Sequence, residues 1–440
     1  MRITVPDHAG TDDTAPSYSG PEIDLDTVDL FDPALYATGD PHRIWHTLRR
    51  QAPVHRQTLP DGRSFWSITK YHDVNDVLRD HTRFTSSRGT LLSILGSQDP
   101  AGGKMMAASD PPVHTAMREP LMKVMSHRAM KERRPQIRRI VHRRMLAHLL
   151  DGGTWDIAAA AADFPMAFTG TLMGLPERDW PRLTKLTSMA IAPSDSEFQE
   201  GSAHGTLVAA HHELFDYFSR FVRRHPGGDD DLVGFLIGME AGGRRLRHDE
   251  IVFNCYSLLL GANVTTPHAV AATVLALIEH PEEYARLLAD PSLVPGAVDE
   301  GLRWSSPANH FMRYAVRDLE LGGVRIKEGD ALVTWLGSAN RDEDVFPDPY
   351  RFDITRRPNR HVAFGFGPHY CIGAPLAKVA LNILFEEIVR VVEEFRVAGP
   401  VAHLESNFVA GIKHLPLTAR LRPGAENLLR EALQDGLVAV

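Results

Sequence analysis

The stretch from Phe364 to Ala374, FGFGPHYCIGA, decides how this sequence is interpreted, because it frames one cysteine with three glycines, a proline and a histidine. The chain has only two cysteines in 440 residues. A disulfide framework and a four-cysteine zinc site are therefore excluded. Cys371 must act without a second thiol.

The residues around Cys371 favour a particular local structure. Glycines at 365 and 367 let the backbone turn tightly and lie flat against a broad partner, because no Cβ stands in the way. An amphipathic helical pattern begins at Ala374, so Cys371 should lie near a helix N-terminus. Free N–H groups and the positive end of the helix dipole there favour a thiolate over a thiol. A thiolate beside a flat, glycine-lined surface suits the axial position of a haem iron.

Other roles for a lone cysteine are open at this point. Such a residue is most often a small buried hydrophobe, which is the interpretation we give to Cys255. A nucleophilic cysteine–histidine pair is conceivable, but His369 is only two residues from Cys371 and need not face the sulfur. A dinucleotide-binding loop is disfavoured, because the glycine spacing differs and the segment follows no strand of a βαβ unit.

The segment resembles the haem-binding signature of the cytochrome P450 family, F-G-x-G-x-H-x-C-x-G. Six fixed residues match: Phe364, Gly365, Gly367, His369, Cys371 and Gly373. The resemblance extends over nearly the whole chain after its N-terminal arm and is to the soluble bacterial branch. It implies haem b as the cofactor, held at Phe364, Gly365 and Gly373, with Cys371 as the iron ligand.

Charge and composition limit the partners. The formal net charge of -8 and the pI near 6.3 argue against nucleic acid as a partner, since phosphate binding needs a basic surface. The N-terminus has no apolar run that could form a signal peptide or an anchor. We expect a cytoplasmic monomer that does not bind membranes. Residues 1–20 are expected to be a disordered arm, and 21–440 a single domain.

Helical periodicity dominates the chain. Apolar residues three and four apart predict helices over 41–52, 135–150, 211–224, 249–281 and 374–395. Shorter alternating segments predict a hairpin of strands at 53–59 and 64–69, and further strands near 313–336. We expect a mainly α, α+β protein with the cytochrome P450 fold: a large helical domain with a long central helix, and a smaller β-rich portion.

Two further motifs resemble family features. Glu300 and Arg303 lie three residues apart on a predicted helix, where their side chains can pair, and they match the family's E-x-x-R motif. Arg351, in DPYRF, resembles the arginine that closes this network on the proximal side of the haem. The implied role of all three residues is structural.

Haem carries two propionates, and burying carboxylates requires cationic or hydrogen-bonding partners. His114 and Arg118 lie four residues apart and resemble the family's H-T-x-x-R segment, which holds the propionates. Arg313 and His361 resemble two further propionate contacts.

The centre of the long predicted helix reads GANVTTP, where the family has A-G-x-[D/E]-T-T. The alignment places Thr265 on the conserved alcohol and Val264 on the acid, which is absent. Oxygen activation consumes protons that this acid normally helps to relay. We expect Thr265 to hydrogen-bond to the Gly261 carbonyl, and Pro267 to leave the Asn263 carbonyl unpaired. Our hypothesis is that Thr265 and Asn263 hold the water that delivers protons.

The resemblance implies a substrate pocket above the haem. Its expected lining comprises Leu91, Leu92, Ala262, Val264, Ala308, Phe311 and Phe408. The implied reaction is O₂-dependent hydroxylation or epoxidation of a small organic substrate, which we expect to be a natural-product intermediate.

Electrons must come from separate proteins, because the sequence shows no flavin or nicotinamide domain. The resemblance implies a ferredoxin and its reductase. Residues 118–144 hold ten Lys or Arg against two acids, which indicates a solvated helix face or a docking site for the ferredoxin. Two alternatives stay open: oxidative coupling or peroxide-driven turnover, and a non-catalytic partner or activator protein with the same fold.

Overall fold

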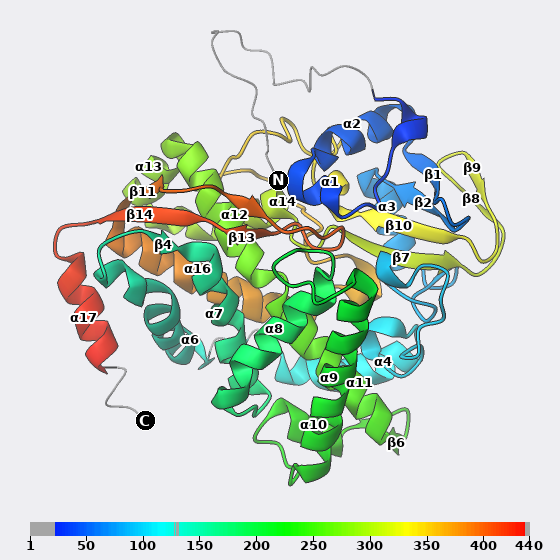
Figure 1. The fold of residues 1–440 in the computed structure, drawn as a ribbon, viewed down its shortest axis with the longest axis horizontal. Coiled ribbons are helices and arrows are strands. Elements are labelled where there is room, and N and C mark those ends of the chain that lie inside the picture. The colour runs from blue at the N-terminus through cyan, green and yellow to red at the C-terminus, as the bar shows by residue number, and fades with distance from the viewer. Residues whose placement is uncertain (1–22, 127, 129–131, 436–440) are drawn as a thin grey trace.

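The structure, a computed structural model, describes residues 23–126, 128 and 132–435 of the chain. The expected arm at 1–20 lies outside the described residues. As expected, the fold is mainly helical with a smaller β portion (Figure 1). Figure 1 shows a five-stranded sheet beside α1, α2 and α3 on one side of the view, and a three-stranded sheet on the other.

The five-stranded sheet has the order β1-β2-β10-β7-β3. The predicted hairpin is present as β1 (Val54–Thr58) and β2 (Ser64–Ile68), which pair antiparallel. β10 (Ala331–Trp335) runs parallel to β2 and antiparallel to β7 (His310–Ala315). β7 also pairs with β3 (Phe84–Thr85) and carries Arg313 toward the site described below.

The remaining elements are mostly helices around a shared apolar core. The helices are α1 (Ala34–Thr38), α2 (Pro41–Gln51), α3 (Tyr71–Arg79), α4 (Val113–Val124), α6 (Arg134–Ile140), α7 (Ile157–Leu172), α8 (Trp180–Ile191), α9 (Ala203–Arg224), α10 (Leu232–Gly238), α11 (His248–Asn263), α12 (Thr266–Glu279), α13 (Pro281–Ala289), α14 (Val294–Ser305), α15 (Leu336–Ala339), α16 (Ala374–Val391) and α17 (Ala425–Asp435). The other strands are β4 (Trp155–Asp156), β5 (Glu240–Ala241), β6 (Arg244–Arg245), β8 (Leu319–Leu321), β9 (Val324–Ile326), β11 (Val392–Val397), β12 (Ala402–His403), β13 (Ile412–His414) and β14 (Pro416–Leu421).

Two predicted helices end differently from the expectation. The helix predicted to run through 249–281 is interrupted: α11 ends at Asn263, and α12 begins at Thr266 with Pro267 in its first turn. Proline lacks the N–H that would continue the helical ladder and is well tolerated in a first turn, so it favours a restart here. The helix predicted to reach residue 395 ends at Val391, and the chain continues as β11, paired antiparallel with β14.

The α11–α12 segment passes through the interior of the molecule. Apolar side chains of both helices, such as Leu259 and Val274, join the largest core cluster with Phe164 and Leu384 from α7 and α16. The segment His248–Glu279 is apolar and long enough to cross a membrane, but most of its most apolar window is buried inside the protein. Buried core helices pass the same test of length and composition, so this observation is weak evidence for a membrane span.

Candidate active site

The loop that carries Cys371 is shaped by two glycines with left-handed backbone conformations, Gly365 (φ 71°) and Gly367 (φ 72°). A Cβ at Gly367 would lie 2.7 Å from the Cα of Arg79 in α3, so only glycine fits this approach. The Cys371 N–H donates to the Phe364 carbonyl at 2.9 Å, which closes the loop just before α16.

The sulfur of Cys371 is held in an environment with opposing effects. Burial raises the pKa of the Cys371 thiol, while the N–H groups of Gly373 and Ala374 and the Arg118 guanidinium act to lower it. The donors expected at the helix N-terminus are therefore present, but burial is the larger effect and the net pKa is raised. A thiolate in this loop needs an additional cation beside it, and a metal ion meets that need.

Cys371 opens onto a cavity of about 420 Å³. The predicted site residues that line it are Leu91, His114, Arg118, Ala262, Val264, Thr265, Ala308, Phe311, Arg313, Phe364, Gly365, Cys371, Gly373 and Phe408. Leu92 does not line the cavity, and the prediction for it was wrong. Its side chain is fully buried in the core cluster under β10 and β7, because neighbouring residues of a short 3₁₀ turn point in different directions.

One part of the cavity wall is rich in cationic and hydrogen-bonding groups for which the described residues supply no ion pair: Arg313 donates only to the Met312 carbonyl at 2.8 Å, and Arg118 donates to the Tyr370 carbonyl. Arg313 is 3% exposed, and burial lowers the pKa of its guanidinium to about 10, with only Asp110 acting in the other direction. Neither ring nitrogen of His114 has a hydrogen-bond partner. A buried guanidinium and a buried imidazole in this state need an acid. The two propionates of haem fit this need, and Arg118 lies on the same wall.

The fourth member of this group is His369, and the prediction of His361 was wrong. His361 does not line the cavity, and its Nε2 lies 3.6 Å from the Asp299 carboxylate instead. His369 lines the cavity, with its ring centroid 4.2 Å from that of His114 and its Nε2 3.1 Å from the Ser86 hydroxyl. Its place in the signature, two residues before the cysteine, is the signal by which the sequence could have assigned it this role.

The break between α11 and α12 places a hydroxyl on the cavity wall. Val264 and Thr265 form the turn, and Thr265 lines the cavity. The expected hydrogen bond from Thr265 to the Gly261 carbonyl is not found in the described part of the chain. Thr266 instead donates to the carbonyl one turn back, that of Ala262, at 3.4 Å.

Asn263 does not line the cavity, but its buried Oδ1 has no hydrogen-bond partner among the described residues, so the role predicted for it in holding water stays a prediction. Its amide donates to the Leu259 carbonyl at 2.8 Å and is buried in the protein. Asn263 directly precedes the break, so its side chain still follows the helix and bonds one turn back. Val264, which stands where the family has an acid, is 4% exposed and packs in an apolar cluster with Ile191 and Val409.

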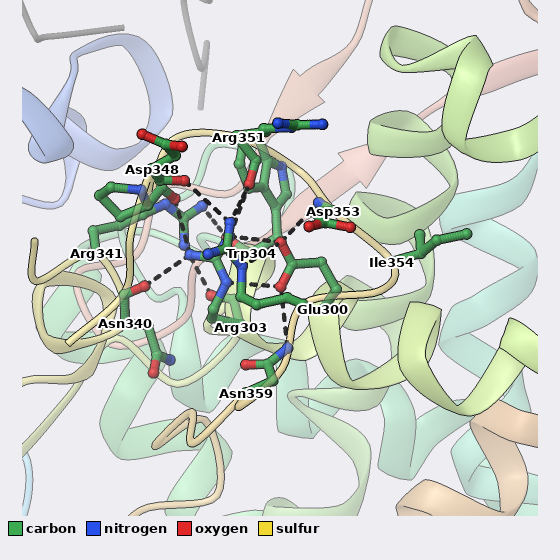
Figure 2. Close-up of polar contacts among 12 residues, drawn as sticks. Glu300, Arg303, Trp304, Asn340, Arg341, Asp348, Arg351, Asp353, Ile354 and Asn359 are labelled. Carbon is green, nitrogen blue, oxygen red and sulfur yellow. Dashed lines mark hydrogen bonds and ion pairs between the residues drawn. The ribbon is translucent and has the colours of Figure 1, made fainter. Parts of the chain in front are cut away.

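The predicted pair of Glu300 and Arg303 is present (Figure 2), but the arginine that closes the network is not the predicted one. Glu300 and Arg303 of α14 are fully buried and form a bidentate ion pair at 2.7 and 2.8 Å. Arg356 closes the network, with its Nε 3.2 Å from Glu300. Arg351 was the wrong arginine: its side chain is exposed and points away, and only its carbonyl takes part, accepting from Arg356 at 2.8 Å and from Arg303 at 3.2 Å.

Comparisons with known proteins agree with this geometry. A family model described as Cytochrome P450 matches residues 202–405. Cytochrome P450 NovI of Streptomyces niveus is 32% identical over 92% of this chain and 98% of its own length. Cyclomarin C epoxidase CymV of Salinispora arenicola is 32% identical over 86% of this chain and 96% of its own. The crystal structure of P450 OxyD, involved in the biosynthesis of vancomycin-type antibiotics, has a TM-score of 0.79 at 31% identity and covers 90% of this chain and 100% of its own.

The chain therefore belongs to the cytochrome P450 family. It is a haem-thiolate monooxygenase, and its cofactor is haem b. The alternative of a non-catalytic protein with this fold is set aside by the same relatives.

Proposed function

We propose that the enzyme hydroxylates or epoxidises a small organic substrate, an intermediate of natural-product biosynthesis, with one oxygen atom of O₂. The observation that carries this proposal is the cavity, which joins Cys371 to a mostly apolar wall formed by residues such as Leu91, Phe311 and Phe408. Two relatives support it by name, one an epoxidase and one an antibiotic-biosynthesis P450.

Each part of the wall has its own task in the proposed reaction. Haem bound at Cys371 supplies the oxygen and electron chemistry. Arg118, Arg313, His114 and His369 line the part of the wall that would hold the propionates. The apolar wall excludes bulk water from the reacting carbon.

Thr265 is the residue that we assign to proton delivery. Its hydroxyl lies at the cavity wall, where α11 ends, and the last carbonyls of an α-helix lack intrahelical donors. Pro267 has no N–H to give the Asn263 carbonyl, so ordered water can bridge between such carbonyls and the hydroxyl. Without an acid at position 264, this water is the route by which protons reach the substrate cavity beside Thr265.

We further propose that electrons arrive from a ferredoxin and its reductase, in the cytoplasm, to a monomeric enzyme. The basic run is less free than its sequence suggests, because Arg134 and Arg138 both pair with Glu386 of α16 at 3.1 Å. Arg144 is likewise paired, with Glu177. Apart from Arg118, which lines the cavity, the cations for which the described residues show no ion pair are Lys123, Arg133, Arg139 and Arg143. This smaller set is the surface that we assign to an acidic ferredoxin.

Two measurements test the proposal: the carbon monoxide spectrum of the reduced protein and the incorporation of ¹⁸O into the product. Reduced protein under carbon monoxide should show the red-shifted Soret band of thiolate ligation, and Cys371→Ser should abolish it. With ferredoxin, reductase and NADPH, the product should gain one labelled oxygen from ¹⁸O₂ and none from labelled water. A product without label from ¹⁸O₂ would contradict the proposed monooxygenation.

The valine at position 264 favours two other reactions, oxidative coupling and peroxide-driven turnover, because both depend less on a proton relay. Peroxide-driven turnover predicts that hydrogen peroxide alone supports turnover at a rate equal to that with the redox partners. Oxidative coupling predicts a coupled product that lacks added oxygen.

A further inference from the structure

The charges on the cavity wall do not balance once haem is considered. Asp99 is the only carboxylate among the described residues that line the cavity. The two guanidinium groups on the wall, Arg118 and Arg313, match the two propionates of haem in number and charge. The negative charge of Asp99 is then left without a counterpart.

Asp99 lies in the loop between β3 and α4 and is partly buried. One carboxylate oxygen accepts the Ala101 N–H at 2.9 Å, and no ion pair to Asp99 is found in the part of the chain that the structure describes. Burial raises the pKa of its carboxyl group. A desolvated carboxylate of this kind is stabilised by any cation that enters the cavity.

Three aromatic rings line the same cavity as Asp99. Phe215 of α9 packs against Phe253 and Tyr256 of α11, with ring centroids 5.3 and 4.7 Å apart. The Tyr256 hydroxyl hydrogen-bonds to His211 at 3.0 Å. The loop that follows Asp99 packs on α11 beside these rings, because the Met106 N–H donates to the Asn254 side chain at 2.9 Å and the Asn254 amide donates to the Lys104 carbonyl at 3.1 Å. Burial raises the pKa of the Tyr256 hydroxyl, and the charge of Asp99 acts in the same direction. Ring faces next to a carboxylate form a binding site for an organic cation.

A lysine near these rings does not neutralise Asp99. The Lys104 ammonium lies 5.7 Å from the Phe253 ring centroid, but it pairs with Asp249 at 3.3 Å. Lys104 does not line the cavity. Lys104 is therefore paired with Asp249, and no ion pair between Asp99 and a lysine or arginine is found among the described residues.

We propose that the substrate is an amine that carries a positive charge, with its ammonium group held between Asp99 and the rings of Phe215, Phe253 and Tyr256. The apolar remainder of the substrate then extends along the wall toward Thr265 and Cys371. This inference rests on the proposed function and names its substrate class.

The test compares three probes that carry a similar alkyl chain but differ in the charge of the head group, on the haem-loaded enzyme. The probes are decyltrimethylammonium, its neutral analogue with carbon in place of nitrogen, and decanoate. A quaternary nitrogen has no lone pair, so it cannot ligate iron and confuse the result. We expect calorimetry to show the ammonium probe binding about tenfold more tightly than the neutral analogue, with decanoate weakest.

Variants test whether the preference for the ammonium probe over the neutral analogue depends on Asp99 and the rings. Asp99→Asn retains the acceptor for the Ala101 N–H and should bring the ratio of affinities close to one, while leaving the neutral probe unchanged. Asp99→Glu should keep the preference, and Phe253→Leu should reduce it. Asp163→Asn, which removes an exposed acid of α7, is the matched control and should change nothing.

Equal affinity for the charged and neutral probes, or an unchanged ratio in Asp99→Asn, would overturn the proposal. The carbon monoxide spectrum of each sample separates this result from a failure of the proposed function. A normal thiolate band with equal affinities contradicts only the amine substrate, whereas a missing band in the parent enzyme contradicts the monooxygenase itself.

Discussion

At the scale of single residues, the buried Glu300 carboxylate pairs with the side chain of one nearby arginine, Arg356, and not with that of another, Arg351. Arg356 donates to Glu300 and is almost fully buried, whereas the Arg351 side chain lies in solvent. We expect Arg356→Ala to lower the free energy of unfolding by about 2–4 kcal/mol, because it removes one partner of a buried carboxylate. Arg351→Ala should change it by less than about 0.5 kcal/mol. Urea denaturation of the haem-loaded proteins measures both, and equal losses would contradict our assignment.

His369 and His361 provide a second matched pair of residues. His369 lines the cavity beside His114, and its ring can donate a hydrogen bond to a propionate. We expect His369→Phe to release haem to apomyoglobin about fivefold faster, which corresponds to one lost hydrogen bond. His361→Phe should release haem at the rate of the parent enzyme, since His361 faces Asp299. The reverse order would restore the role that the sequence suggested for His361.

These residue-level differences show what the sequence could and could not predict. Glu300 and Arg303 were assigned correctly because their spacing of three on one helix brings them together whatever the rest of the chain does. Arg356 was missed because it reaches Glu300 from an irregular loop, where spacing carries no information about direction. Leu92 was misplaced for a related reason: it is a chain neighbour of a cavity residue but points elsewhere.

At the scale of elements, the cysteine loop depends on its close approach to α3. Gly367 and Gly103 share the same φ of 72°, but a Cβ at Gly367 would clash with Arg79 and a Cβ at Gly103 would meet nothing within 4 Å. Gly103→Ala should therefore cost about 1 kcal/mol of stability, from backbone strain alone. Gly367→Ala should cost clearly more and also lower haem content, because the loop must move away from α3. Thermal unfolding and the ratio of haem to protein measure the difference, and equal effects would argue against the close approach.

The break between α11 and α12 leads to a prediction about coupling. Thr265→Ala removes the hydroxyl at the cavity wall while Pro267 keeps the break in place. We expect about tenfold less product per NADPH consumed, with the remaining electrons appearing as hydrogen peroxide. Thr265→Ser keeps the hydroxyl and should retain most of the coupling. If Thr265→Ala couples as well as the parent enzyme, protons reach the site by another route.

The same elements show the limits of periodicity. Apolar spacing predicted the helical character of 249–281 correctly, because α11 and α12 both contribute buried apolar side chains to the core. It could not place the break, since Val264 and Thr265 fit a continuous helix as well as a turn. It also extended the last long helix through 392–395, where pairing with β14 outweighs local helix preference.

At the scale of the whole molecule, Asp195 joins distant parts of the chain. It lies just after α8, is 1% exposed, and accepts the Glu405 N–H at 2.9 Å and the Lys413 ammonium at 2.6 Å from the C-terminal region of β12 and β13. Burial alone would raise the pKa of Asp195, but the Glu405 N–H, the Lys413 ammonium and the Glu197 N–H together hold it below its ordinary value of 3.8.

A lowered carboxyl pKa in the folded state makes stability depend on pH in a defined direction. Below pH 3.8 the unfolded chain binds a proton at Asp195 that the folded protein does not bind. The unfolded state is therefore stabilised relative to the folded state as the pH falls. We expect the contribution of Asp195 to the free energy of unfolding to be complete above about pH 5 and to decrease progressively below it. Asp195→Asn should be less stable at neutral pH and should show a shallower decrease in acid, measured by urea denaturation from about pH 6 to 3. Asp163→Asn, an exposed control, should run parallel to the parent enzyme. Parallel curves for Asp195→Asn would mean that its link to the C-terminal strands does not contribute to acid sensitivity.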